Sequence, residues 1–169
     1  VDELYAVLNQ SDYAAERYHG AMEQRDREVA VFKFDNGTVN ILVCTDLAAR
    51  GLDIQQVKHV IHFEEALDEA SFTHRNGRTG RLQQDAGYVY MFYQNEKDLE
   101  KYQTDFIDYN IDKSFNLNLN KQDFNARTQA PQRDTIYLNL GKQDKIQKGD
   151  ILGFLTKELS IKAADVGKI

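Results

Sequence analysis

Three arginines recur at every third position in one short segment of the chain. Arg75, Arg78 and Arg81 lie within residues 74–81, His-Arg-Asn-Gly-Arg-Thr-Gly-Arg. Guanidinium groups repel one another at close range, and each presents a planar fork that matches two phosphate oxygens. The two glycines let backbone amides approach the same anion. The segment therefore predicts a site for a phosphate-rich ligand, although an arginine triplet alone is more typical of a solvated basic turn.

A second polar segment continues directly from an apolar strand. Residues 41–44 are Ile-Leu-Val-Cys, and residues 45–53 are Thr-Asp-Leu-Ala-Ala-Arg-Gly-Leu-Asp. In open α/β sheets, ligands bind where such strands end. The presence of this strand end upstream of the arginines favours the ligand site over the isolated basic turn.

These segments resemble motifs of the DEAD-box RNA helicases. Residues 45–53 resemble motif V, residues 74–81 resemble motif VI, and residues 24–27, Gln-Arg-Asp-Arg, resemble the QxxR element. Three matches in the family's order are specific. The resemblance implies the second RecA-like domain of an ATP-dependent RNA helicase, an α/β domain whose parallel sheet is flanked by helices.

The resemblance also implies which residues meet the nucleotide. In the closed enzyme Arg78 and Arg81 would act as catalytic arginine fingers, stabilising charge on the γ-phosphate of ATP. Gly51 and Asp53 would complete the nucleotide-binding set. His74 and Arg75 would link the two RecA-like domains. These roles are expectations from the family.

RNA contacts are implied at the neighbouring strand ends. The resemblance implies that they grip the sugar-phosphate backbone without reading the base sequence. One residue of motif VI departs from the family's pattern, because Asn76 occupies a position often filled by isoleucine or another small or apolar residue. The implied RNA-binding residues of this domain are Gly20, Gln24, Arg27, Thr45, Asp46 and Arg50.

Two nucleotide-binding motifs are absent from the sequence. The chain has no GxxxxGK[ST] phosphate loop and no Asp-Glu-Ala-Asp tetrad, which in the family hold ATP phosphates and Mg²⁺. We therefore expect ATP and Mg²⁺ to be bound mainly by an N-terminal RecA-like domain outside this chain. The chain is expected to be a fragment, lacking the first strand of its RecA-like domain, and to be inactive as an ATPase by itself.

Composition sets further bounds. The chain has 169 residues, is 41% hydrophobic and carries a formal net charge of -6, so any RNA surface must be local. The single cysteine, Cys44, excludes an internal disulfide and is expected to be buried. His59 and His62 fall on opposite faces of one strand, so no metal site is predicted. No apolar run reaches membrane length, and we expect a cytoplasmic protein without membrane contact.

The pattern of apolar residues divides the chain into three parts. We predict a helicase C-terminal RecA-like domain at 1–113, a linker at 114–133 and a truncated RNA-binding domain at 134–169. Within the first part, helices are predicted at 1–9, 22–34, 67–72 and 95–109, and strands at 14–19, 39–44, 57–63 and 87–93.

The last part resembles the opening of a DbpA-type RNA-binding domain. An alternating strand at 135–140, a loop and a helix are expected, with a second strand beginning at 166–169 of a partial RRM-like α+β module. Lys142, Lys145 and Lys148 form a basic loop that could bind RNA phosphates. An ordinary solvated loop fits the same residues equally well.

The function implied by the resemblance is ATP-dependent separation of short RNA duplexes. DbpA-type helicases use their C-terminal module to bind large-subunit ribosomal RNA during ribosome assembly, so that RNA is an expected partner. A non-catalytic RNA-binding or regulatory module derived from half of a helicase core remains an alternative. A DNA translocase of the wider superfamily is a third hypothesis, and the sequence of residues 45–53 together with the DbpA-like C-terminal part argues against it.

Overall fold

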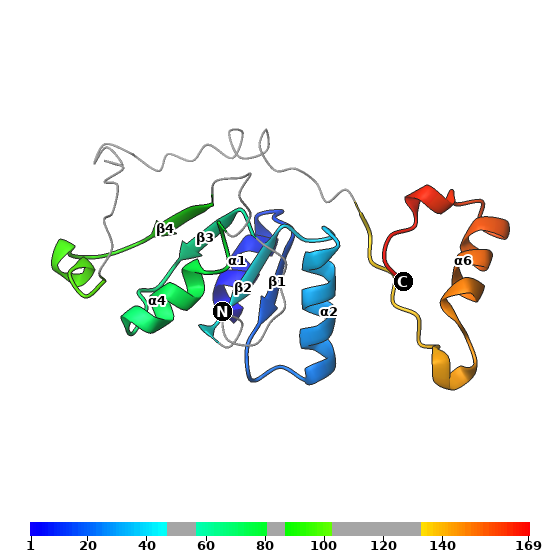
Figure 1. Ribbon diagram of the computed structural model, residues 1–169, viewed down its shortest axis with the longest axis horizontal. Helices are drawn as coiled ribbons and strands as arrows, with labels where there is room; N and C mark the ends of the chain where they lie inside the picture. Colours follow the sequence, from blue (N-terminus) through cyan, green and yellow to red (C-terminus); the bar gives the residue numbers. More distant parts are fainter. Residues whose placement is uncertain (47–56, 81–86, 103–132) are drawn as a thin grey trace.

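Strands and helices alternate through most of the described chain and are followed by a smaller helical segment (Figure 1). The structure is a computed structural model, and it describes residues 1–46, 57–80, 87–102 and 133–169. The predicted linker and the end of the helix predicted at 95–109 lie outside these residues, apart from Arg133.

Two pairs of parallel strands form the sheet structure. β1 (Ala15–Tyr18) pairs with β2 (Ile41–Cys44), and β3 (His59–His62) pairs with β4 (Tyr88–Met91). Parallel neighbours need crossover connections, which helices supply here. All four strands lie within the segments predicted as strands. The α/β class with parallel strands is thus confirmed for the residues described.

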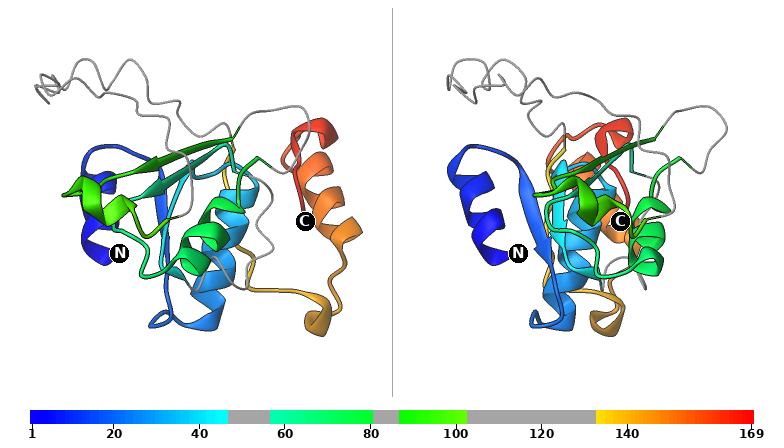
Figure 2. Two further views of the ribbon diagram at one scale, coloured as in Figure 1. Left: turned by 60° about the vertical axis from the view of Figure 1, so that its left-hand side comes forward. Right: turned by 90° about the vertical axis from the view of Figure 1, so that its left-hand side faces the viewer.

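Helices lie on both sides of the β1–β2 pair. α1 (Asp2–Gln10) covers one side, whereas α2 (Gln24–Asp35) and α4 (Glu69–Asn76) lie on the other (Figure 2). Ala30 of α2 is 1% exposed, in agreement with its predicted inward position. The spacing of Leu4, Val7 and Leu8 predicts that these side chains form the buried stripe of the first helix. This was wrong for Val7, because α1 packs on β1 and leaves Val7 58% exposed.

A small aromatic core holds the segment after β3 against the segment after β4. Phe72 and Tyr102 are each 4% exposed, and their ring centroids lie 4.3 Å apart in a stacked arrangement. The Tyr102 hydroxyl donates a hydrogen bond of 2.8 Å to the buried Ala66 carbonyl. Tyr102 therefore takes part in both the aromatic stack and the hydrogen bond that hold the two segments together.

Tyr102→Phe tests this core. The buried Ala66 carbonyl would lose the hydroxyl that donates to it, so we expect the free energy of unfolding to fall by roughly 1–3 kcal/mol in a urea titration. Tyr90→Phe removes a hydroxyl from a residue that is 47% exposed and should change the same quantity by less than about 0.5 kcal/mol. Equal effects of the two substitutions would show that the buried Tyr102–Ala66 hydrogen bond adds no more to the free energy of unfolding than an exposed hydroxyl does.

Two further predictions in the first part were wrong. The helix predicted to begin at residue 95 is, in its described part, only the 3-10 turn η1 (Glu96–Leu99). The chain there turns early so that Tyr102 can enter the core. Cys44 is exposed rather than buried, because it is the last residue of β2 and lies where the pairing with β1 ends.

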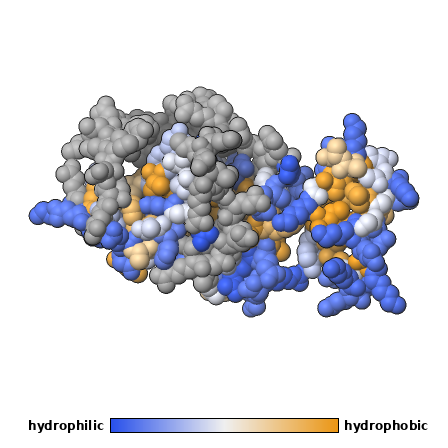
Figure 3. Space-filling model, in the orientation of Figure 1, coloured by the Kyte–Doolittle hydropathy of each residue, from blue (hydrophilic) through white to orange (hydrophobic). Residues whose placement is uncertain are grey.

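The C-terminal segment is organised around α6 (Lys148–Lys157), which confirms the predicted helix. The strand predicted at 135–140 does not form, because among the described residues this extended segment has no neighbouring strand to pair with. The second strand predicted at 166–169 is likewise absent from the described structure. Apolar side chains gather at the surface of this segment (Figure 3), and its exposed members include Ile136, Leu138, Leu140, Phe154 and Leu159.

Polar contacts connect this segment with α2. The Asn36 side chain donates a hydrogen bond of 2.8 Å to the Thr135 hydroxyl, and the Arg25 guanidinium lies 4.5 Å from the centroid of the Tyr137 ring. The Tyr137 ring therefore contacts an arginine of α2 in this structure. None of the described helices is both long and apolar enough to span a membrane.

Candidate functional site

The carboxyl ends of β1 and β2 bring Gly20 and Thr45 to the same edge of the sheet. Tyr18 lies opposite Cys44 in the parallel register, and the Thr45 amide donates to the Tyr18 carbonyl at 3.3 Å. Gly20 follows β1 in an exposed turn, and Thr45 is also exposed. Both residues predicted to contact RNA therefore lie at accessible strand ends, as the family resemblance implies.

α2 adds Arg27 to this edge. Its guanidinium lies 6.0 Å from the centroid of the Tyr18 ring, at the limit of a cation–π contact. The Arg27 Nε atom is buried and has no hydrogen-bond partner among the described residues. Gln24 lies at the exposed start of the same helix and donates to the Glu28 carboxylate at 2.7 Å, so its amide nitrogen is already engaged within α2.

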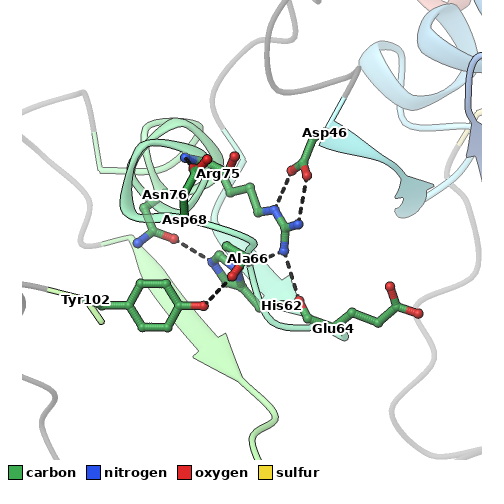
Figure 4. A network of polar contacts seen from close by, with 9 residues as sticks. Asp46, His62, Glu64, Ala66, Asp68, Arg75, Asn76 and Tyr102 are labelled. Carbon is green, nitrogen blue, oxygen red and sulfur yellow. Dashed lines mark hydrogen bonds and ion pairs between the residues drawn. The ribbon is translucent and has the colours of Figure 1, made fainter. Parts of the chain in front are cut away.

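Asp46 connects this edge to the arginine segment through a two-point ion pair. Arg75 Nε lies 2.5 Å from Asp46 Oδ1, and Arg75 Nη2 lies 3.0 Å from Asp46 Oδ2 (Figure 4). The Asp46 carboxylate raises the pKa of the Arg75 guanidinium above its ordinary value, against an opposing effect of burial. Two parallel charge-assisted bonds fix the relative orientation of the groups as well as their distance.

This ion pair changes the interpretation of both residues. Arg75 was grouped with Arg78 and Arg81 as guanidiniums that phosphate neutralises, but in the structure the Asp46 carboxylate neutralises Arg75. Asp46 was expected to bind RNA phosphate or to brace the loop that does, and both of its oxygens accept from Arg75. A carboxylate repels phosphate, so the geometry fits a bracing role for Asp46 at the strand end better than a direct RNA contact.

α4 positions Arg75 near its carboxyl end. Asp68 begins the helix by accepting a hydrogen bond of 2.7 Å from the Ser71 amide, and Gly77 ends it. His74 and Arg75 fall in the last turn, where cations are favoured by the helix dipole. His74, predicted to link the two domains, is exposed.

Arg78 follows α4 and is held through its backbone. Its carbonyl accepts from the Val57 amide at 3.1 Å, and the next residue, Thr79, donates its hydroxyl to the Lys58 carbonyl at 3.2 Å. Although Cys44 is exposed as a residue, desolvation raises the pKa of its thiol, whereas the nearby guanidiniums of Arg75 and Arg78 lower it. Arg78 therefore lies within electrostatic range of the end of β2.

Two glycines shape the turn that contains Arg78 and Thr79. Gly80 has a φ of 73°, a backbone conformation that glycine adopts without steric cost. A Cβ atom at Gly87 would lie 2.2 Å from the Thr79 hydroxyl oxygen and 2.6 Å from the Gly80 amide nitrogen. Glycine is therefore required at position 87 by close approach of the backbone.

Sequence reasoning missed the pairing of His62 with Asn76. From the sequence alone, His59 and His62 are both expected to be structural or solvent-facing. His62 is 1% exposed, with Nε2 lying 2.7 Å from Asn76 Oδ1. Asn76 departs from the family's pattern in motif VI, and the side chain that explains this departure, His62, lies on β3 rather than on α4. The available signal was a histidine directly after the apolar pair Val60-Ile61, together with a polar residue inside motif VI.

The remaining predicted site residues are partly beyond the described structure. Among the described ranges, no group of three or more His, Cys, Asp or Glu side chains is placed to hold a metal ion. The loop lysines Lys142, Lys145 and Lys148 are all exposed. Four predicted residues lie outside the described residues: Arg50, Gly51, Asp53 and Arg81.

Comparison with known families identifies both parts of the chain. The family "Helicase conserved C-terminal domain" matches residues 1–83, and the family "DbpA RNA binding domain" matches residues 135–169. The ATP-dependent RNA helicase DbpA of Escherichia coli (strain K12) is 35% identical over 163 residues, which are 96% of this chain and 35% of that protein. The DEAD-box ATP-dependent RNA helicase CshA of Bacillus subtilis (strain 168) is 53% identical over 81 residues, which are 48% of this chain and 16% of that protein.

Solved structures agree with this assignment. The C-terminal domain of the DEAD-box protein Dbp5 superposes with a TM-score of 0.53 at 27% identity, covering 59% of this chain and 58% of that one. The E. coli DEAD-box protein SrmB, bound to regulator of ribonuclease activity A, superposes with a TM-score of 0.54 at 33% identity, covering 60% of each chain. The likeness thus extends from the motifs to the parallel α/β fold.

The chain belongs to the DEAD-box RNA helicases. A helicase C-terminal domain followed by a DbpA RNA-binding domain makes it part of a helicase of the DbpA type. The chain spans about a third of the length of its E. coli relative and about a sixth of the length of the B. subtilis relative.

Proposed function

We propose that this chain forms one half of an ATP-dependent RNA helicase that separates short RNA duplexes, with ribosomal RNA remodelling as its setting. An N-terminal RecA-like domain would hold ATP and Mg²⁺, and this chain would close over them. Arg78 and Arg81 would then stabilise the negative charge that develops on the γ-phosphate during hydrolysis.

The Asp46–Arg75 ion pair is the observation that carries the proposal. It joins Asp46, two residues after β2 and beside the candidate RNA contacts, to the helix that precedes Arg78. Contacts of 2.5 and 3.0 Å at two points leave little freedom for either group. RNA bound at the strand ends would therefore influence the position of the arginines that face the nucleotide, as RNA-stimulated ATP hydrolysis requires.

The grip on RNA would be independent of base sequence. Gly20 and Thr45 offer exposed backbone and hydroxyl groups at neighbouring strand ends, and Arg27 supplies a positive charge beside them. Such contacts suit phosphate and sugar oxygens, which carry no direct sequence information. Single-stranded RNA held in this way would be prevented from re-forming a regular duplex.

The C-terminal segment would select the RNA. Its exposed lysines, Lys142, Lys145 and Lys148, are suited to phosphate oxygens. The neighbouring carboxylates are engaged with backbone amides, since Asp144 accepts from Gly141 at 2.9 Å and Asp150 accepts from Gln147 at 2.8 Å. We propose a structured ribosomal RNA, of the large subunit, as the ligand of this segment.

The direct test joins residues 1–169 to all of the E. coli relative that precedes its matching segment, so that the N-terminal RecA-like domain and the expected missing strand are both supplied. This protein is referred to below as the joined enzyme. We expect ATP turnover that rises on adding RNA, and no turnover from the isolated chain. RNA binding without any ATP turnover in the joined enzyme would favour the alternative, a non-catalytic RNA-binding module. Stimulation by DNA equal to that by RNA would favour a DNA translocase.

A further inference from the structure

A buried imidazole lies between two residues of the arginine segment. His62 ends β3 and is 1% exposed, and its ring packs against Phe72 with centroids 5.1 Å apart. Both ring nitrogens have partners on α4: Nε2 lies 2.7 Å from Asn76 Oδ1, and Nδ1 lies 3.3 Å from Arg75 Nη1 (Figure 4). His62 thus contacts the residues on either side of the Arg75–Asn76 peptide bond.

These partners determine which nitrogen of His62 carries the proton. A guanidinium group can only donate hydrogen bonds, so Nδ1 must accept from Arg75. The proton of the neutral ring is then on Nε2, where it is donated to the Asn76 side-chain oxygen. Arg75, His62 and Asn76 therefore form a chain of hydrogen bonds that runs in one direction.

The same chain completes the surroundings of Arg75. Its Nη1 donates to the Glu64 carbonyl at 2.9 Å as well as to His62, while Nε and Nη2 donate to Asp46. These four bonds occupy four of the five N–H groups of a guanidinium. The Arg75 guanidinium is therefore bound by the Asp46 carboxylate on one side and by His62 and the Glu64 carbonyl on the other.

We propose that His62 is a positioning residue, a neutral Nε2–H imidazole that orients Arg75 toward Asp46 and ties Asn76 to the end of β3. The role rests on the proposed function, because its consequence is the placement of the arginine segment for ATP hydrolysis. His62 touches neither nucleotide nor RNA in this scheme. This role explains why motif VI carries a polar residue at Asn76: the Asn76 side-chain oxygen accepts the hydrogen bond from the protonated Nε2 of His62.

Protonation of His62 would break this arrangement. An imidazolium has a second N–H on Nδ1, which would point at the Arg75 guanidinium. Burial lowers the pKa of His62 from its ordinary value of 6.5, the Asn76 hydrogen bond raises it, and Arg75 and Asp46 act in opposite directions. Cys44 and Tyr102 are further titratable groups that act on the Arg75 guanidinium.

The first experiment measures the ring itself in the 169-residue chain. Nitrogen-15 NMR of the histidine side chains, with the His62 signals assigned by their loss in His62→Phe, should show Nε2 protonated and Nδ1 unprotonated at neutral pH. His62 should remain neutral as the pH falls through 6.5, where an unperturbed histidine is half protonated. A proton on Nδ1, or titration at or above 6.5, would overturn the proposal.

The second experiment separates positioning from packing in the joined enzyme. His62→Phe keeps the ring but removes both hydrogen bonds, so we expect a lower unfolding midpoint and a fall in ATP turnover of roughly 10- to 100-fold. His62→Phe combined with Asn76→Leu replaces both partners by apolar groups and should recover most of the midpoint. Turnover should stay low, because Arg75 still lacks its acceptor. Recovery of turnover together with the midpoint would show that His62 serves packing alone.

His59→Phe is the matched control. His59 lies on the opposite face of β3, where it is exposed and stacks on Tyr88 with centroids 5.3 Å apart. We expect this substitution to leave turnover unchanged, and an equal loss would count against a specific role of His62. Absence of turnover in the unsubstituted joined enzyme would count against the proposed function, whereas the NMR result on the chain decides the positioning role independently.

Discussion

Replacing Arg78 with alanine in the joined enzyme is expected to lower RNA-stimulated ATP turnover by about 10³-fold, the smaller end of the effect of losing an arginine finger. Arg78 follows α4 directly, and its backbone is tied to the start of β3 through the Val57 amide. Its side chain is thus presented from a well-held turn. Alanine cannot supply the positive charge with which Arg78 would stabilise the transition state.

RNA affinity separates this effect from a general loss of structure. RNA binding by the Arg78→Ala enzyme should change little, because the candidate RNA contacts lie on other elements. Arg17→Ala is the control, since Arg17 is a partly exposed arginine on β1 whose partner is Asp2. Turnover of Arg78→Ala close to that of the unsubstituted enzyme would refute the arginine-finger assignment.

Asp46→Ala is expected to reduce the stability of the 169-residue chain by roughly 1.5–3 kcal/mol, measured by urea unfolding. The side chains of Arg75 and Asp46 are only 21% and 31% exposed, so the guanidinium would be left partly desolvated without its carboxylate. Arg75→Lys should cost nearly as much, because an ammonium group cannot make two parallel bonds. In the joined enzyme the same substitutions should also weaken the stimulation of ATP turnover by RNA.

A double-mutant cycle isolates this pair. Asp46→Ala and Arg75→Ala together should be less destabilising than the sum of the two, with a coupling energy of about 1–2 kcal/mol. The Lys101–Glu65 pair is the control: its contact is 2.8 Å, its side chains are 38% and 27% exposed, and its coupling energy should be clearly smaller than that of Asp46 and Arg75 because solvent screens it. Additive effects of Asp46→Ala and Arg75→Ala would mean that the ion pair does not link the two segments.

The sequence by itself determined the family and the order of the main elements. Motifs V and VI are local patterns, so their residues can be identified without knowing what surrounds them. Residues 39–44 form a nearly unbroken apolar run, as a parallel strand covered on both faces requires, and residues 87–93 are rich in aromatic residues that favour a strand. The helix α6 (Lys148–Lys157) was expected from the resemblance of this part of the chain to a DbpA-type RNA-binding domain.

Only the tertiary structure decided what the motif residues do to one another. Arg75 and Asp46 are 29 positions apart, and nothing local shows that one neutralises the other. His62 and Asn76 are 14 positions apart on different elements, so the reason for a polar residue in motif VI becomes visible only when β3 and α4 pack together.

The failed predictions have the same physical origin. The segment at 135–140 has the alternation of a strand, yet a strand exists only where a neighbour accepts and donates its backbone hydrogen bonds. Among the described residues that neighbour is absent. Propensity and pattern are properties of single segments, whereas hydrogen-bond partners, burial and charge neutralisation belong to pairs of segments, and such pairs are fixed by the fold.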